Sequence, residues 1–132
     1  AGLTNLEALG LQSTKINGEG LAQLKDLSSL QVLNLGLTAV DNDALAYLKP
    51  FEELETLSLE KTKVTGAGLV HLKGFSKLRT LNLKECDVAA PDLQHLVGLR
   101  NLKMLYLRGT QVTKEQAKKF KKKMNSLAVF FY

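Results

Sequence analysis

Residues 56–72 read TLSLEKTKVTGAGLVHL, and this stretch combines two hydrophobic periods. Leu57 and Leu59 alternate with polar residues, which predicts a short strand whose successive side chains point to opposite faces. After the turn at Gly66, Leu69 and Leu72 lie three residues apart, which is the spacing of one helix face. The stretch therefore predicts a strand, a turn and a short helix in direct succession.

The same pattern recurs every 24 residues, without insertion or deletion. The strand half has the form Leu-x-x-Leu-x-Leu-x-x-Thr-x-Val, and the helix half has three further apolar columns. The strand halves begin at Leu6, Leu30, Leu54, Leu78 and Leu102, and the first helix column runs Leu21, Leu45, Leu69, Leu93 and Ala117. Columns in register predict units that stack side by side, because one unit cannot cover its own leucines.

The repeats predict a single domain over residues 1–132. Its units are 6–29, 30–53, 54–77, 78–101 and 102–125, followed by a degenerate strand in 126–132. The N-terminus starts inside a repeat without a polar cap. Such an end exposes apolar side chains and strand edges, so we expect further repeats upstream, a cap in a longer protein, or self-association through this end.

This pattern resembles the leucine-rich repeat family, whose L-x-x-L-x-L-x-x-N/C-x-L signature it matches apart from threonine at the asparagine position. The Thr-x-Val-Thr-x-x-Gly-Leu turn is similar to repeats common in bacterial members. The resemblance implies an α/β fold: a right-handed solenoid forming a partial horseshoe, with a parallel β-sheet on the concave face and short helices on the convex face. It also implies a buried ladder, in which Thr14, Thr38, Thr62 and Thr110 would serve in place of asparagine.

Helix boundaries have their own signals. Asn17, Asp41, Thr65 and Thr113 share one position and are predicted N-caps, and Thr113-x-x-Gln116 has the spacing of a capping box. Ala89 breaks that column. Gly74 and Gly98 stand where a helix end favours a left-handed residue.

The net charge of +5 is local rather than general. Residues 113–126 hold six lysines and one glutamate, so the rest of the chain is neutral. On a helix from Thr113, Ala117, Phe120 and Met124 share one face, and the lysines of KKFKKK (118–123) cover the other. We interpret them as the polar outside of the last helix. The alternative is a nucleic-acid or anionic-lipid patch, but we expect no nucleic-acid partner.

Two sets of residues invite a catalytic or metal interpretation. Cys86, the single cysteine, falls in the threonine column and is expected to be buried and inert. His71 and His95 lie one repeat apart with Asp92 nearby, but adjacent helices would hold them on solvent-facing flanks, so we expect surface histidines rather than a zinc site. No catalytic set, metal site or cofactor motif is predicted, and the chain is not expected to be an enzyme.

The sequence contains no apolar run that would span a membrane and no signal peptide pattern. Neither the compartment nor the organism follows from it.

Outward-facing strand positions change at every repeat, whereas the core columns hardly change. The first repeats present small residues, and the last two present larger ones. We therefore predict a protein-binding patch on the concave face, centred on Tyr106 and Arg108, since Tyr and Arg are enriched at binding hot spots. Its residues are Glu60, Asn82, Lys84, Met104, Tyr106, Arg108 and Tyr132.

The predicted function is thus a protein–protein interaction module without catalysis. The alternative is a regulatory or targeting segment of a larger enzyme or ligase whose catalytic part lies outside these residues. The identity of the partner does not follow from the sequence.

Truncation of a core leucine tests the repeat itself. Leu57→Ala should lower the free energy of unfolding by about 2–5 kcal/mol, because it leaves a cavity between stacked units. Tyr106→Ala on the outward face should leave folding intact. Denaturant unfolding of both variants measures the difference; equal losses would contradict the assignment of the two columns to core and surface.

Overall fold

The computed structural model describes residues 4–124 and the backbone of residues 128–130. Strands alternate with short helical segments along the chain. The strands are β1 (Ala8–Gly10), β2 (Val32–Asn34), β3 (Thr56–Ser58), β4 (Thr80–Asn82), β5 (Met104–Tyr106) and β6 (Ala128–Phe130). The helical segments are α1 (Gly18–Ala22), η1 (Asp43–Leu48), η2 (Gly66–Leu72), η3 (Ala90–Leu96) and α2 (Lys114–Lys123).

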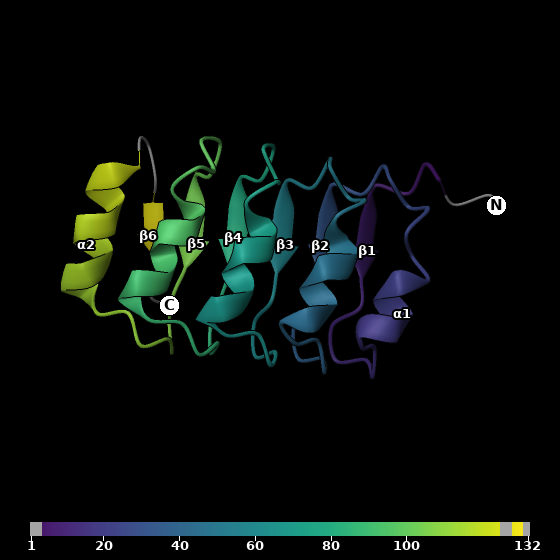
Figure 1. Ribbon diagram of the computed structural model, residues 1–132, viewed down its shortest axis with the longest axis horizontal. Helices are drawn as coiled ribbons and strands as arrows, with labels where there is room; N and C mark the ends of the chain where they lie inside the picture. Colours follow the sequence, from purple (N-terminus) through teal and green to yellow (C-terminus); the bar gives the residue numbers. More distant parts are fainter. Residues whose placement is uncertain (1–3, 125–127, 131–132) are drawn as a thin grey trace.

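The six strands form one parallel sheet in sequential order (Figure 1). Each strand residue pairs with the residue 24 positions later, as Leu33 does with Leu57 and Leu57 with Leu81. In β1 to β5 the central leucine points inward, and the residues on either side of it point outward. The 24-residue period therefore translates directly into sheet register.

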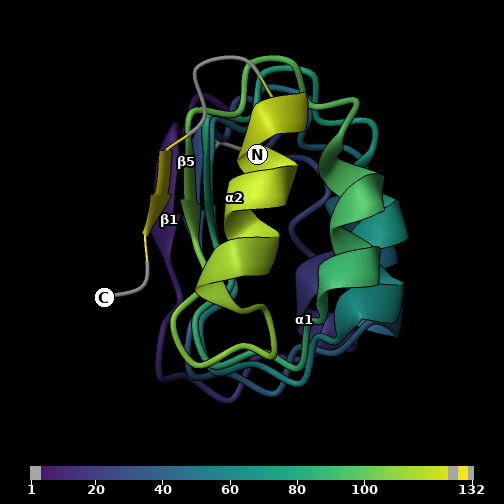
Figure 2. The same ribbon diagram turned by 90° about the vertical axis from the view of Figure 1, so that its left-hand side faces the viewer.

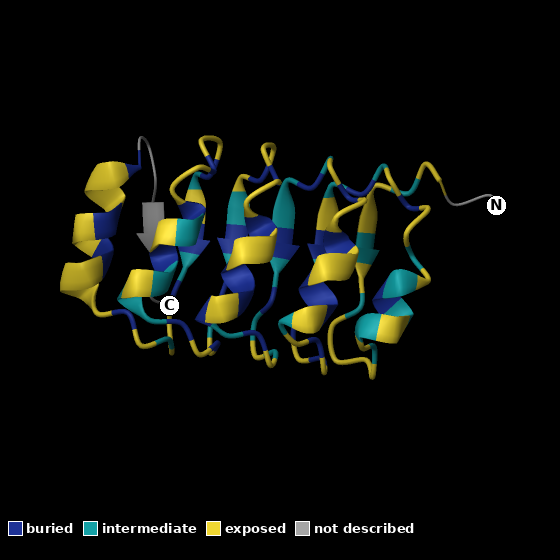
Figure 3. Cartoon of the chain, viewed as in Figure 1, coloured by how far each residue is buried: buried dark blue, intermediate teal, exposed yellow. Residues whose placement is uncertain are grey.

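The sheet forms one face of the molecule and the helical segments form the opposite face (Figure 2). The core lies between these layers, and its residues are the repeated leucine columns (Figure 3). The α/β solenoid expected from the sequence is confirmed. The uncovered side of the sheet, predicted as the concave face, is called the outer sheet face below.

Burial differs between the two ends. At the first repeat, Leu6, Leu9 and Leu11 are only partly buried against the core, whereas Leu105 and Leu107 in the fifth repeat are fully enclosed. The fifth repeat is covered by α2, which packs three residues inward as its sequence predicts: Ala117 and Phe120 within the helix and Met124 just after it.

The three middle helical segments are 3₁₀ helices rather than α-helices. Their ends close with i→i+3 bonds, such as Lys49 N to Ala46 O. A 3₁₀ helix rises about 2.0 Å per residue against about 1.5 Å for an α-helix. Six or seven residues in this form cover more of the helix-side layer before the chain must return to the sheet.

Of the predicted N-caps, Asn17 and Thr113 are confirmed, Asp41 lies one residue before the N-cap Asn42 but still bonds the first turn, and Thr65 holds the N-cap position without a side-chain capping bond. Asn17 accepts from Gly20 N, Asp41 accepts from Ala44 N, and Thr113 forms the full capping box with Gln116. The Thr65 side chain makes no capping bond, because its hydroxyl accepts a hydrogen bond from the Asn42 amide instead.

The threonine column does not form the expected ladder between repeats. Each hydroxyl donates to the carbonyl three residues before it, as Thr38 does to Leu35 O at 2.6 Å, so the bond stays within one repeat. Thr14, Thr62 and Thr110 do the same. A single hydroxyl on a short side chain reaches its own turn but not the next one. Cys86 alone in this column reaches back, donating from Sγ to Leu59 O at 3.0 Å.

The left-handed positions lie elsewhere than predicted. Gly109 is the one described glycine with positive φ, so Gly74 and Gly98 do not end their helices in that conformation. A helix that closes with 3₁₀ bonds has no need of a left-handed residue there. The left-handed column instead follows each strand, and its members are Ser13, Leu37, Lys61, Glu85 and Gly109.

Gly66 and Gly68, the glycines of the opening stretch, admit side chains from both neighbouring repeats. A Cβ on Gly68 would overlap the Asn42 amide, and one on Gly66 would overlap the Asp92 carboxylate. Asn42 bonds Thr65 twice, at 2.8 and 2.9 Å, and Asp92 accepts from Ala89 N at 2.8 Å. Gly68 therefore leaves room for the Asn42 side chain that ties the second repeat to the third, and Gly66 leaves room for the Asp92 carboxylate, whose bond stays within the fourth repeat.

Gly68→Ala tests this contact between the second and third repeats. Helix propensity alone favours alanine by up to about 1 kcal/mol, whereas displacement of the Asn42 amide from Thr65 should cost about 1–3 kcal/mol. We expect the second effect to win and the denaturation midpoint to fall. Gly74→Ala is the matched control, since a Cβ there meets nothing within 4 Å; a stabilised Gly68→Ala protein would contradict the role of this contact.

Candidate functional site

The outer sheet face carries most of the residues predicted to bind a partner. Met104 is 40% exposed, Arg108 is exposed, and Tyr106, Lys84, Asn82 and Glu60 are half-buried. Half-burial here reflects packing against neighbouring rows rather than orientation toward the core. Tyr132 lies outside the described residues, so its part in the patch stays a prediction.

Four of these residues form a connected row across β3, β4 and β5. Asn82 donates from Nδ2 to Glu60 Oε2 at 3.2 Å and accepts from Lys84 N at 3.0 Å. The Lys84 ammonium lies over the Tyr106 ring, 5.2 Å from its centroid. A cation–π contact at an exposed site is worth about 0.5–1 kcal/mol, enough to bias the orientation of both side chains. We call Glu60, Asn82, Lys84 and Tyr106 the linked row.

Met104 and Arg108 flank this row on the fifth repeat. The Thr80 hydroxyl lies 3.8 Å from Met104 Sδ, and Arg108 Nε lies 4.0 Å from Glu85 Oε1. That ion pair is long and half exposed, so it contributes little to stability. The structure thus brings six of the seven predicted residues onto one continuous surface.

A charged hollow lies where β3, β4 and β5 begin, and the sequence did not lead us to predict it. Its volume is about 320 Å³, and we call it the basic hollow; its lining residues are Glu55, Lys77, Arg79, Asn101 and Lys103. Arg79 and Lys103 each follow the first leucine of a repeat. The change from Glu55 to Arg79 to Lys103 in this column was the sequence signal that could have predicted the hollow.

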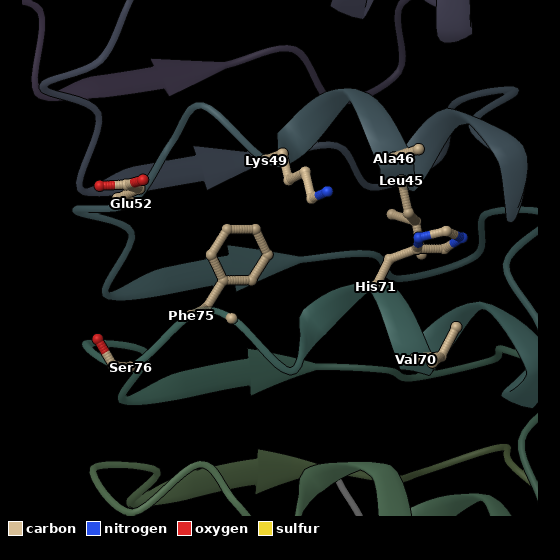
Figure 4. Close-up of a pocket in the computed structure, with 9 residues that line it drawn as sticks. Leu45, Ala46, Lys49, Glu52, Val70, His71, Phe75 and Ser76 are labelled. Atoms are coloured by element: carbon tan, nitrogen blue, oxygen red, sulfur yellow. The ribbon is translucent and has the colours of Figure 1, made fainter.

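The helical face carries a second, larger depression of about 650 Å³ between η1 and η2. Leu45 and Phe75 form its apolar base, Val70 is 43% exposed, and Lys49, Glu52 and His71 supply its polar groups (Figure 4). Its size falls within the range of small-molecule sites. The exposed apolar residue at 70, in a column that faces away from the core, was the sequence signal for it.

Cys86 has the surroundings of a structural thiol. Its side chain is 2% exposed, and Sγ donates to Leu59 O. Burial raises the pKa of the Cys86 thiol. Less of it is then present as thiolate, which is the form that attacks as a nucleophile. The column position therefore predicts its environment correctly.

The histidines lie on the helical face, in η2 and η3. His71 is exposed at the rim of the larger depression, and Asp92 is engaged with Ala89 N. His95 is half-buried, and its Nδ1 has no hydrogen-bond partner among the described residues. Within residues 4–124, no three His, Cys, Asp or Glu side chains gather at metal-binding distance.

The lysines of α2 project away from the core. Lys118 and Lys119 are exposed while Phe120 between the two lysine runs is buried, as the predicted helix face requires. The helix α2 itself lies at the end of the solenoid, on the core side of the sheet (Figure 2). None of the described helices is both long and apolar enough to cross a bilayer.

Comparison with known proteins rests on structure rather than sequence. The sequence matches no protein-family model, and no curated protein matches it. Internalin C2 from Listeria monocytogenes superposes with a TM-score of 0.77 and 29% identity, over 97% of this chain and 52% of that chain. A second internalin from the same organism gives 0.80 and 22%, over 98% of this chain and 35% of that chain.

A plant protein shows the same architecture. The ectodomain of a receptor kinase from Arabidopsis thaliana gives a TM-score of 0.58 and 24% identity, over 93% of this chain and 66% of that chain. The chain thus spans between 35% and 66% of the length of these structures. The 24-residue repeat, the sequential parallel sheet and these matches together show a leucine-rich-repeat fold.

The environment of Cys86 predicts slow alkylation. Native protein at pH 8 should react with iodoacetamide on the order of a hundredfold more slowly than free cysteine, because reaction requires opening of the repeat. Protein in denaturant should react at the free rate. The pKa of Cys86 is raised in the folded state, so the unfolded chain releases the thiol proton first as the pH rises. The wild type should therefore also lose more stability than Cys86→Ala above about pH 8.5. Rapid labelling of the native protein would contradict the structural role.

Proposed function

We propose that this chain is a protein-interaction module that binds a partner protein through the outer sheet face and carries no catalysis of its own. Leucine-rich-repeat neighbours such as the internalins and the receptor ectodomain support an interaction role in general. The residues proposed to make the contact are Glu60, Asn82, Lys84, Met104, Tyr106, Arg108 and Tyr132.

The linked row is the observation that carries this proposal. The Lys84 ammonium and the Tyr106 ring orient each other, and the Asn82 side chain beside them is held by Glu60 and by the Lys84 backbone. Lys84 and Tyr106 nevertheless remain partly accessible on an uncovered face. Side chains fixed before binding lose less conformational entropy when a partner arrives, which leaves more of the contact energy for affinity. Stability alone does not require an aromatic ring and two cations at these positions.

The outward side chains differ in size between the two halves of the outer sheet face, and this difference supports a binding site in its C-terminal half. On β1, Ala8 and Gly10 face outward, and on β3 the outward residues are Thr56 and Ser58. Small side chains of this kind bury little area against a partner. Met104, Tyr106 and Arg108 offer larger groups, of which Tyr and Arg are frequent hot-spot residues.

The double variant Tyr106→Ala, Arg108→Ala tests the proposal. Affinity capture from the native cell extract, quantified by mass spectrometry, should recover a protein with the intact chain and lose it with the double variant. Truncation of one hot-spot tyrosine costs about 2 kcal/mol or more, which corresponds to at least about thirtyfold in affinity.

The matched control is Tyr47→Ala, Lys119→Ala, which removes the same kinds of group from the helical face. Tyr47 is 46% exposed, so its loss should not impair folding. Equal recovery of every protein by the double variant and the intact chain would refute binding through Tyr106 and Arg108.

A further inference from the structure

Charged side chains on the outer sheet face are segregated by sign along the solenoid. Four columns face outward in the described repeats, at the positions of residues 55, 56, 58 and 60 and their equivalents. Among the charged residues of these columns, the first and third repeats carry only carboxylates, the second carries none, and the last two carry only cations. The carboxylates are Glu7, Glu55 and Glu60, and the cations are Arg79, Lys84, Lys103 and Arg108. The next column differs, with Lys61 in the third repeat and Glu85 beside Arg108 in the fourth.

Two of the cations are held side by side in the basic hollow. The backbone fixes their spacing, because Lys103 N donates to Arg79 O at 2.8 Å and adjacent parallel strands lie about 4.8 Å apart. Glu55 borders Arg79 on the other side, through the bond from Arg79 N to Glu55 O. Lys77, which also lines the hollow, forms a salt bridge with Glu53 at 2.7 Å, and that hydrogen bond raises the pKa of Lys77.

The basic hollow adjoins the apolar part of the outer sheet face. Met104 directly follows Lys103, and Tyr106 lies on the same strand two residues further along. A ligand that reaches from the hollow across β5 therefore meets a pair of cations first, then an exposed thioether, then an aromatic ring. A ligand that matches this order carries a negative group followed by apolar groups.

We propose that the partner contributes an acidic segment, with a carboxylate in the basic hollow between Arg79 and Lys103 and an apolar or aromatic side chain on Met104 and Tyr106. This inference rests on the proposed function and specifies the chemistry of the partner. The carboxylates of the first three repeats fix the orientation, because the acidic part of the segment is repelled from Glu55 and Glu60.

The arrangement favours an acidic protein segment over a nucleic acid. A single strand needs a continuous basic track with stacking surfaces along its backbone. In the four columns the cations stop at β3, where Glu55 and Glu60 begin, and α2, which carries the other lysine cluster, lies on the core side of the sheet (Figure 2). A hollow of about 320 Å³ suits one carboxylate better than a chain of phosphates.

Selection of random dodecapeptides displayed on phage against the immobilised chain tests the proposal. We expect the selected peptides to be enriched in Asp and Glu with a neighbouring apolar residue. Synthetic copies should bind Arg79→Glu, Lys103→Glu at least about tenfold more weakly than wild type, and more weakly in 0.5 M salt. Glu55→Gln should bind them more tightly, because it removes the one carboxylate in the hollow.

The matched control is Lys118→Glu, Lys119→Glu, which makes the same change in net charge on α2. It should retain affinity within about threefold. An equal loss in both double variants would show that the peptides respond to overall charge, and it would overturn the assignment to the hollow. Circular dichroism of each variant verifies that it is folded.

The outcomes separate this inference from the proposed function. Peptides that depend on Tyr106 but show no acidic enrichment would overturn the acidic partner while leaving the binding face in place. Peptides indifferent to Tyr106→Ala would refute the face itself.

Two further measurements test whether a nucleic acid or a second copy of the chain occupies the outer sheet face instead. Displacement of a selected peptide by an equal concentration of a single-stranded dodecanucleotide would indicate a nucleic-acid site and overturn the proposal. Dimerisation of the unliganded chain, detected by light scattering and abolished by Arg79→Glu, Lys103→Glu, would show that a second copy occupies the face, with the same consequence.

Discussion

Every repeat depends on its neighbours to bury its leucines. Leu57 pairs in register with Leu33 and Leu81, and all three side chains are fully enclosed because a repeat lies on each side. Burial of one leucine side chain contributes about 1.5–3 kcal/mol, so a slip in register would cost a large part of the total stability. The absence of insertions in the 24-residue period keeps these columns aligned. The outer sheet face exists as a set of straight rows for the same reason.

The repeat alone predicts most of the fold. Two hydrophobic periods predicted the strands and the helical segments, and the invariant spacing predicted which residues would pair. What it did not predict depends on contacts between units. Gly66 and Gly68 read as turn residues, yet they are required by Asn42 and Asp92, which lie 26 residues away in the preceding repeat and in the following repeat respectively. The sequence pattern likewise did not distinguish 3₁₀ from α geometry, since repeats of the same length form the α-helices α1 and α2 and the 3₁₀ helices η1, η2 and η3.

The residues of the candidate site could be predicted from the sequence, but the contacts between their side chains could not. Tyr106 and Arg108 were identified from residue type and outward position. The linked row was not, because it depends on rotamers that bring Asn82 to Glu60 and Lys84 over the Tyr106 ring. The basic hollow was missed for a different reason: Arg79 and Lys103 precede their strands, and pattern analysis weights the strand itself. Positions just before a strand thus contribute to the same surface as those within it.

The unequal enclosure of the two ends has a kinetic consequence. In this chain Leu6 and Leu9 are less enclosed than Leu105 and Leu107, so hydrogen exchange should be faster in the first repeat than in the fifth. Met104 and Tyr106 belong to the fifth repeat, on the sheet face opposite the core that α2 covers. Local melting in solution would therefore spare the surface that we assign to recognition, and this surface would persist until the last cooperative unit is lost.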